Sequence, residues 1–165
     1  MRTIDKLIPV VVIFLVGIIG YLLYDNKYNS FNPSVNITSN NIDEFFSLSK
    51  RNIQKYYGEY DYKEKYNNNE FYCYKDENRC LRYSKKNKVI AILLMSSNKL
   101  EGIKANTSID IIEKKLNEEA NEVIENDCKK IYLSNRLNDY RVTYSSKSNC
   151  NKEEIKKIDY ILIEL

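Results

Sequence analysis

The most constraining feature of the sequence is an uncharged, apolar stretch of eighteen residues from Leu7 to Tyr24. As an α-helix it would be about 27 Å long, close to the roughly 30 Å thickness of the hydrocarbon core of a bilayer. Arg2 and Lys6 give the short segment before it a positive excess, and basic ends stay on the cytoplasmic side of a membrane. The sequence therefore predicts a single-pass cell-membrane protein with a cytoplasmic N-terminus and an extracytoplasmic C-terminal domain.

A cleaved secretory signal peptide is the alternative interpretation of this stretch, because it has the same basic start and apolar middle. The small residues that a cleavage site needs are poorly placed, since Gly17 and Gly20 are flanked by bulky side chains. Both interpretations place the same polar domain outside the cytoplasm. We therefore divide the chain into an anchor at residues 1–24, a flexible Asn- and Ser-rich stalk at 25–41, and a folded part that follows.

The folded part contains an internal repeat. Residues 49–59 align with 108–118, with a serine, an isoleucine, a lysine and a closing turn residue in step, and residues 88–94 align with 157–163. In each copy a serine precedes an apolar stripe at helical spacing, and four short runs of strand-forming residues follow. Such a unit of about 60 residues buries a small core and is marginally stable alone, so we expect the two units to pack together.

From this repeat we expect an α+β fold of two tandem modules, at residues 42–98 and 99–165. Each module should be a helix packed on a four-stranded antiparallel meander, because short turns join only antiparallel neighbours. The expected strands lie at 60–66, 70–75, 80–84 and 88–96 in the first module, and at 121–125, 129–134, 140–146 and 156–164 in the second. Alternatively, the second helix continues to Asn126, since Ala120, Val123 and Ile124 extend its apolar stripe.

Four cysteines support an extracytoplasmic domain, because an even number outside the cytoplasm permits disulfides. Cys73 and Cys80 bracket a predicted hairpin turn, and a bridge from Cys128 to Cys150 would close the second module. Four free thiols are the alternative. The chain has no histidine and neither pair is a CxxC, so we expect no metal site and no cofactor.

The turn Gly102-Ile103-x-x-Asn106-Thr107-Ser108, followed by a short helix and a meander, resembles the module shared by the β-lactamase-inhibitor protein and the SmpA/OmlA (BamE) lipoproteins. The doubling over Ile42–Leu165 is similar to that of the inhibitor. The Leu-Gly-x-Pro that ends the family helix is here only Tyr57-Gly58 and Leu116-Asn117, without proline, and the chain lacks a lipid-acceptor cysteine at its anchor. The resemblance implies a binding or assembly scaffold without catalysis.

The composition excludes several classes of function. Without histidine there is no Ser-His or Cys-His pair, and the interspersed basic residues form no nucleic-acid-binding stripe. A surface hydrolase would have to use carboxylates near residues 118–127, and these four glutamates are better explained as a solvated face: Glu118, Glu119, Glu122 and Glu125. We expect no enzyme.

The remaining candidates for function are the tyrosines, of which the chain has fifteen. Tyrosine offers broad, stiff contact area with a polar tip, which suits protein interfaces and stacking on sugars. The alternation of the strands would place about half of them in the core. The candidate binding residues are Tyr60, Tyr62, Tyr66, Tyr72 and Tyr74. We therefore expect a membrane-anchored binding or scaffold protein that contacts another envelope protein, as an inhibitor or assembly factor, through its sheet; the alternative partner is a cell-wall glycan.

Overall fold

The computed structural model describes residues 13–20, 31–96, 98–151 and 154–165, which divide into two units, Met1–Asn32 and Pro33–Leu165. In the first unit, residues 13–20 are helical. Across the described ranges no helix is both long and apolar enough to cross a bilayer. The predicted transmembrane helix is therefore not found, and most of the stretch on which it was predicted lies outside the described residues.

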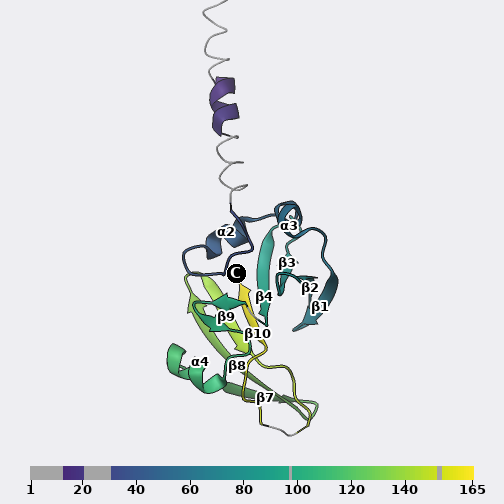
Figure 1. Ribbon diagram of the computed structural model, residues 1–165, viewed down its shortest axis with the longest axis vertical. Helices are drawn as coiled ribbons and strands as arrows, with labels where there is room; N and C mark the ends of the chain where they lie inside the picture. The colour runs from purple at the N-terminus through teal and green to yellow at the C-terminus, as the bar shows by residue number, and fades with distance from the viewer. Residues whose placement is uncertain (1–12, 21–30, 97, 152–153) are drawn as a thin grey trace, which may run out of the picture. The chain divides into compact units, whose positions relative to one another are not determined.

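The unit Pro33–Leu165 is built on one eight-stranded antiparallel sheet (Figure 1). The order of the strands across the sheet is β1-β2-β3-β4-β10-β9-β8-β7. Their bounds are β1 Tyr62–Tyr66, β2 Asn69–Tyr74, β3 Arg79–Tyr83, β4 Val89–Met95, β7 Asn121–Glu125, β8 Cys128–Leu137, β9 Tyr140–Ser145 and β10 Tyr160–Glu164. A separate hairpin is formed by β5 Lys99–Leu100 and β6 Ile103–Lys104.

The prediction of two tandem modules, each with its own four-stranded sheet, is wrong, because the two meanders are joined into a single sheet. The last strands of the meanders, β4 and β10, pair in an antiparallel register that sets Leu93 opposite Leu162. These strands are also the most apolar, and five of the seven side chains of β4 are buried. Pairing them covers two free edges and buries both strands at the centre of the sheet, which a module of four strands cannot do alone.

The strands themselves lie near their expected positions, with differences at the ends. The last strand begins at Tyr160 rather than at residue 156, and β8 continues to Leu137. Equivalent bridges also join Ser49 to Lys88 and Ser108 to Lys157, ahead of the two central strands. The internal repeat therefore relates two halves of one sheet.

Three short helices accompany the sheet: α2 Ile42–Ser47, α3 Lys50–Tyr57 and α4 Ile109–Leu116. The first turn of α3 is closed by a capping box, in which the N–H of Asn52 donates to Ser49 Oγ and the N–H of Ser49 donates to Asn52 Oδ1. Helix α4 ends with Asn117 in the left-handed conformation, so the alternative of a longer helix is wrong. The strand β7 occupies the segment after it.

Helices α2 and α3 cover one face of the sheet. Phe46 of α2 stacks on Tyr140 of β9 at a centroid distance of 4.4 Å, and Tyr57 of α3 meets Tyr74 of β2 edge-on at 5.1 Å. Side chains from both halves of the sheet therefore pack under these two helices. We call this side of the sheet the helix-covered face.

Part of the predicted stalk belongs to the folded unit. Ile37 is only 1% exposed and forms a bridge to Leu100, and the carbonyl of Pro33 accepts a hydrogen bond of 2.6 Å from Arg79 Nη1. Arg79 is itself buried, and its Nη2 donates to Asn98 Oδ1 at 2.9 Å. The flexible stalk predicted to reach residue 41 is therefore wrong from Pro33 onward, because a buried arginine takes its carbonyl partners from this segment.

Both predicted disulfides are confirmed. Cys73 and Cys80 lie opposite each other on β2 and β3, with their Cα atoms 3.9 Å apart, and Cys128 is bonded to Cys150. All four cysteines are thus oxidised, and the alternative of free thiols is wrong. Disulfides of this kind are typical of proteins outside the reducing cytoplasm.

Candidate functional site

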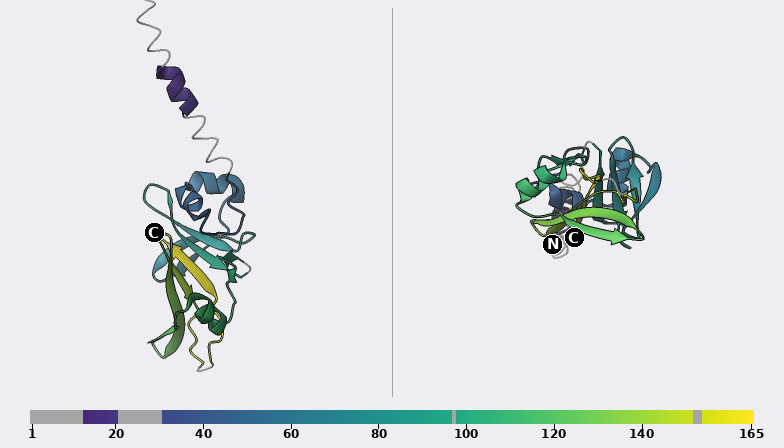
Figure 2. Two further views of the ribbon diagram at one scale, coloured as in Figure 1. Left: turned by 90° about the vertical axis from the view of Figure 1, so that its left-hand side faces the viewer. Right: turned by 90° about the horizontal axis from the view of Figure 1, so that it is seen from below.

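The other face of the sheet is concave. The hydroxyl of Tyr66 on β1 contacts that of Ser145 on β9, although four strands lie between β1 and β9. In a flat sheet these two strands would be about 24 Å apart. Lys130 Nζ on β8 also reaches Asn67 Oδ1 in the β1–β2 turn at 3.1 Å, so the sheet must curl towards this side. Figure 2, right, shows the blue β1–β2 hairpin and the green β7–β8 hairpin extending to the same side.

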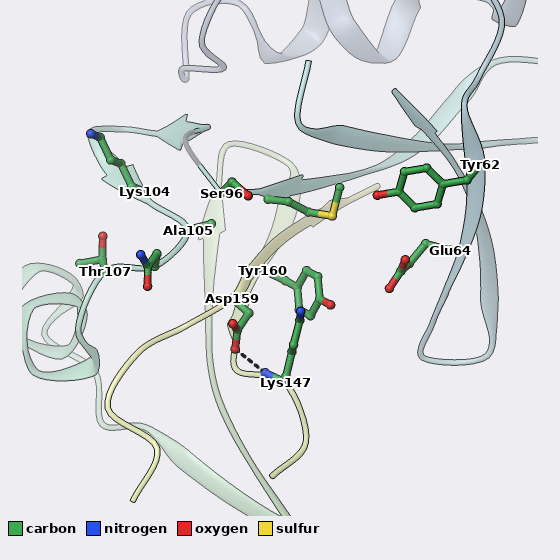
Figure 3. Close-up of a pocket in the computed structure, with 11 residues that line it drawn as sticks. Tyr62, Glu64, Ser96, Lys104, Ala105, Thr107, Lys147, Asp159 and Tyr160 are labelled. Carbon is green, nitrogen blue, oxygen red and sulfur yellow. Dashed lines mark hydrogen bonds between the residues drawn. The ribbon is translucent and has the colours of Figure 1, made fainter. Parts of the chain in front are cut away.

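A groove of about 620 Å³ opens on the concave face (Figure 3). Its floor consists of Tyr62 from β1, Met95 from β4 and Tyr160 from β10, which are partly buried and pack against the core cluster around Phe71 and Leu93. Polar side chains line its rim: Glu64, Ser96, Lys104, Asn106, Thr107, Lys147 and Asp159. The groove thus has an aromatic floor and many hydrogen-bonding groups around it.

The pairing of the strands explains how this floor is assembled. Met95 and Tyr160 lie directly opposite each other across β4 and β10, so the join between the two halves of the sheet places them together. Tyr62 comes from the edge strand β1, which the curl of the sheet brings towards the central strands. The floor therefore combines residues from both copies of the repeat.

Charges around the groove are balanced, with Lys104 and Lys147 against Glu64 and Asp159. The main-chain N–H of Lys147 donates to Asp159 Oδ2 at 2.7 Å and fixes that carboxylate. The ammonium group of Lys147 lies 5.7 Å from the centroid of the Tyr160 ring. Burial, together with the Glu64 and Asp159 carboxylates, raises the pKa of Tyr160 to about 12. Its hydroxyl is therefore protonated at neutral pH and can both donate and accept.

A second hollow of about 490 Å³ lies on the concave face over β8 and β9. It is lined by hydroxyl groups of Tyr132, Ser134 and Thr143, and by Lys130 and Arg141. Burial lowers the pKa of Lys130. The contact between Tyr66 and Ser145 crosses the concave face near this hollow, so the face offers two polar recesses.

The five predicted tyrosines do not form one strip. Tyr62 and Tyr66 lie on the concave face, where Tyr62 lines the groove and Tyr66 is only 7% exposed. Tyr72 and Tyr74 lie on the helix-covered face, where Tyr74 is 2% exposed and Tyr60 meets Tyr72 edge-on at 5.0 Å. The register of the β1–β2 hairpin causes this split: it sets Tyr62 opposite Cys73, so even-numbered side chains point to opposite faces on the two strands.

The four glutamates of the hydrolase alternative are all exposed, and Glu122 forms an ion pair of 2.5 Å with Lys129. Exposed carboxylates are not desolvated in the way that acid–base catalysis requires. Among the described residues no cluster of cysteine, aspartate and glutamate side chains could hold a metal ion. This region therefore gives the hydrolase alternative no support.

Several groove residues were not candidates in the sequence: Met95, Ser96, Lys104, Lys147 and Asp159. They lie at strand ends and in turns, and they meet only because β4 pairs with β10. The signal that could have found them is the repeat itself, since joining its two last strands places Met95 beside Tyr160. Tyr160 belonged to the wider tyrosine set, without any indication that it would lie near Tyr62.

Comparison with known proteins gives the fold. No family model matches the sequence, and neither does any curated protein. The chain is similar to an extracellular protein containing an SCP domain from Bacillus anthracis, with a TM-score of 0.51 and 9% identity over 82% of this chain and 47% of that one. It is also similar to YjgB, a DUF4309 family protein from Bacillus subtilis, with a TM-score of 0.50 and 12% identity over 70% of this chain and 77% of that one.

The chain spans about half the length of the SCP-domain protein that it matches. At these identities the likeness shows the fold alone and says nothing about activity. Neither similar structure is named as a β-lactamase inhibitor or an SmpA/OmlA lipoprotein. That resemblance stays an expectation from the sequence.

Proposed function

We propose that this protein is a non-catalytic binding module of the cell envelope, which receives part of another envelope protein in the groove on its concave face. The observation that carries this proposal is the construction of the groove, in which Tyr62, Met95 and Tyr160 form an apolar floor beneath a polar rim. Fixed aromatic rings with hydrogen-bonding groups around them are typical of protein recognition sites. The groove has a volume of about 620 Å³, enough for a few side chains of a partner.

The proposed location is the outer side of the cell membrane. Two disulfides support a position outside the cytoplasm, and the apolar stretch Leu7–Tyr24 supports attachment to the membrane. Protease added to intact cells should then digest the unit Pro33–Leu165, and loss of the protein from washed membranes would contradict the attachment.

The test is site-specific photo-crosslinking in cells that express the full chain. A photoreactive residue at Ser96, which is exposed on the rim of the groove, should capture a partner protein, and the same residue at Lys86, in a turn away from the groove, should not. Tyr62→Ala should reduce the capture through Ser96 because it removes part of the floor. The matched variant Tyr56→Ala, on the outer side of α3, should leave it unchanged. Equal capture at Ser96 and Lys86 would contradict the proposal.

A cell-wall glycan is the second candidate ligand, because Tyr62 and Tyr160 present partly exposed rings beside the polar groups of Asn106 and Thr107. Sugars bind in this way, with one face on an aromatic ring and hydroxyls bonded to side chains. Sedimentation of the protein with isolated cell-wall polysaccharide, weakened by Tyr62→Ala and unaffected by Tyr56→Ala, would favour the glycan over the protein partner.

A further inference from the structure

The two edges of the sheet are β1 and β7, and both are exposed. Figure 1 shows them as the outermost strands of the two meanders. Lys63 and Lys65 on β1 are exposed, and on β7 Ile124 is 66% exposed. An edge strand carries unpaired N–H and C=O groups that can pair with another strand. Each edge is therefore a template for one more strand.

The hairpin turns show which main-chain groups are available. Asn67 and Asn68 form a two-residue turn between β1 and β2, and Asn126 and Asp127 form one between β7 and β8, all at positive φ. The residues that flank such a turn pair through hydrogen bonds, and the bonded positions then alternate along the strand. By this count, Lys63 and Lys65 of β1 point their main-chain groups outward from the sheet. On β7 the equivalent residues are Glu122 and Ile124.

The charges of the two edges are opposite. On the helix-covered side, β1 carries Lys63 and Lys65, whereas β7 carries Glu122; Glu125, the last residue of β7, points to the concave side. Pairing of β1 with β1 would place lysines together, and directly opposed like charges destabilise a sheet. Pairing of β1 with β7 avoids this repulsion and sets the lysines of one edge against the glutamate of the other.

We propose that β1 of one molecule pairs with β7 of a second copy of this chain, which extends the sheet from molecule to molecule. An antiparallel register with Lys65 opposite Glu122 of the second copy pairs the outward main-chain groups of both edges and opposes no like charges. It sets Lys63 opposite Ile124, so the four residues with outward main-chain groups face each other. On the concave side, Glu64 then lies opposite Val123, and no carboxylates are opposed.

The architecture of the single chain supports this arrangement. Within one molecule the two copies of the repeat are already joined through an antiparallel pairing of their last strands, β4 and β10. The proposed contact joins the repeats of two molecules in the same antiparallel way through their first strands. Since the two surfaces differ, the contact is head-to-tail and produces rings or open chains of molecules.

Cross-linking through introduced cysteines tests the proposal, because all four native cysteines are in disulfides and do not react with maleimides. Two full-length chains with different tags are co-expressed, one with Lys63→Cys and the other with Ile124→Cys, and treated with a short bismaleimide. The mixed dimer should form at least about tenfold more than either dimer of one variant with itself. Lys86→Cys with Ile124→Cys is the matched control, which should give only the background.

Charge reversal gives a second measurement. Lys65→Glu in the first chain should lower the mixed dimer about fivefold, and so should Glu122→Lys in the second. Together these two changes should restore it, because the ion pair is re-formed with its sign reversed. Thermal unfolding of each variant checks that the fold is kept.

Three results would overturn the proposal: a mixed dimer at the level of the control, equal amounts of the same-edge dimers, or cross-linking of the β1 cysteine mainly to a different protein. The third result would mean that β1 accepts a strand from another protein. Capture through Ser96 in the groove is measured separately, so this proposal and the proposed function fail independently.

Discussion

In the first half of the sheet, Cys73 and Cys80 are completely buried, whereas in the second half Cys150 is exposed and Cys128 partly exposed. The strands show the same contrast, since β2 has three buried residues among six and β8 has one among ten. Yet the two halves share their order of helix and strands. Cys73 and Cys80 lie on the concave face, in one core cluster with Tyr66, Phe71 and Leu93. On the opposite face, the segment that starts at Pro33, together with α2 and α3, packs on side chains of the first half.

Helix α2 is the exception, because it contacts both halves at equivalent positions. Aligning β3 with β9 places Arg79 over Tyr140. The Arg79 guanidinium lies 5.5 Å from the Phe45 ring, and Tyr140 stacks on Phe46 and donates a hydrogen bond of 2.6 Å to Asp43. The repeat has thus diverged at one position into a buried cation in the first half and an aromatic ring in the second.

The strongest test of this contrast is Arg79→Ala. Arg79 is 2% exposed and its guanidinium donates to carbonyl groups of Pro33 and Val35 and to Asn98, so removing it leaves buried acceptors without partners. We expect a loss of about 3–5 kcal/mol in the free energy of unfolding, measured by urea denaturation. At the equivalent position, Tyr140→Phe removes one hydrogen bond and should lose about 1 kcal/mol.

The control for Arg79 is Arg51→Ala on the exposed side of α3, which should change the free energy of unfolding by less than about 0.5 kcal/mol. Equal losses for Arg79→Ala and Tyr140→Phe would show that the first half is no more dependent on its covering segment than the second.

The two disulfides should differ in reduction under native conditions. The Cys128–Cys150 bond is accessible to a reductant, whereas reaction at Cys73–Cys80 requires the first half of the sheet to open. We expect the rate constants for reduction to differ by at least about a hundredfold, measured by alkylation and mass spectrometry over time. In denaturant the two rates should converge. Similar rates without denaturant would mean that the reductant reaches Cys73–Cys80 without opening of the first half.

High pH should destabilise both halves through buried tyrosines. Burial raises the pKa of Tyr144 in the second half to about 12, and it also raises the pKa of its counterpart Tyr83 in the first half. A folded-state pKa above the unfolded value of about 10 means that the folded state holds its proton more tightly. The stabilisation that comes from this difference in pKa is fully present below pH 10 and is lost as the pH rises towards 12.

Tyr144→Phe tests this dependence, because it removes the titrating hydroxyl and keeps the ring. The slope of the free energy of unfolding between pH 10 and 12 should become shallower by up to about 1.4 kcal/mol per pH unit. Denaturation at fixed temperature across this range measures the slope. An unchanged slope would assign the alkaline loss of stability to other tyrosines, such as Tyr83.

Local signals explain why the strands could be predicted from the sequence. The turn residues Asn67, Asn68, Asn126 and Asp127 all adopt positive φ, which asparagine and aspartate tolerate better than other non-glycine residues. Alternating side chains between these turns defined the strands, and the two cysteine pairs followed from the hairpins. The same local signals gave the end of α4 at Asn117.

The arrangement of the sheet could not be predicted in the same way. Whether β4 and β10 pair or remain the edges of two modules depends on contacts between residues far apart in the sequence. The groove depends on this pairing as well as on the curl that brings Tyr62 over the centre of the sheet. Of the five candidate tyrosines, Tyr62 lines this groove, while Tyr74 lies under α3.

The smallest expected difference concerns the two serines that precede α3 and α4. Ser49 takes part in a capping box with Asn52, whereas the side chain of Ser108 makes no capping hydrogen bond to α4. Ser49→Ala should therefore lose about 1 kcal/mol in the free energy of unfolding, and Ser108→Ala less than about 0.5 kcal/mol. Urea denaturation of both variants under one set of conditions measures the difference. The main-chain bridge of Ser108 to Lys157 is kept in Ser108→Ala, because it does not use the side chain. If Ser108→Ala lost as much as Ser49→Ala, the two helix starts would therefore be equivalent in energy despite their different side-chain hydrogen bonds.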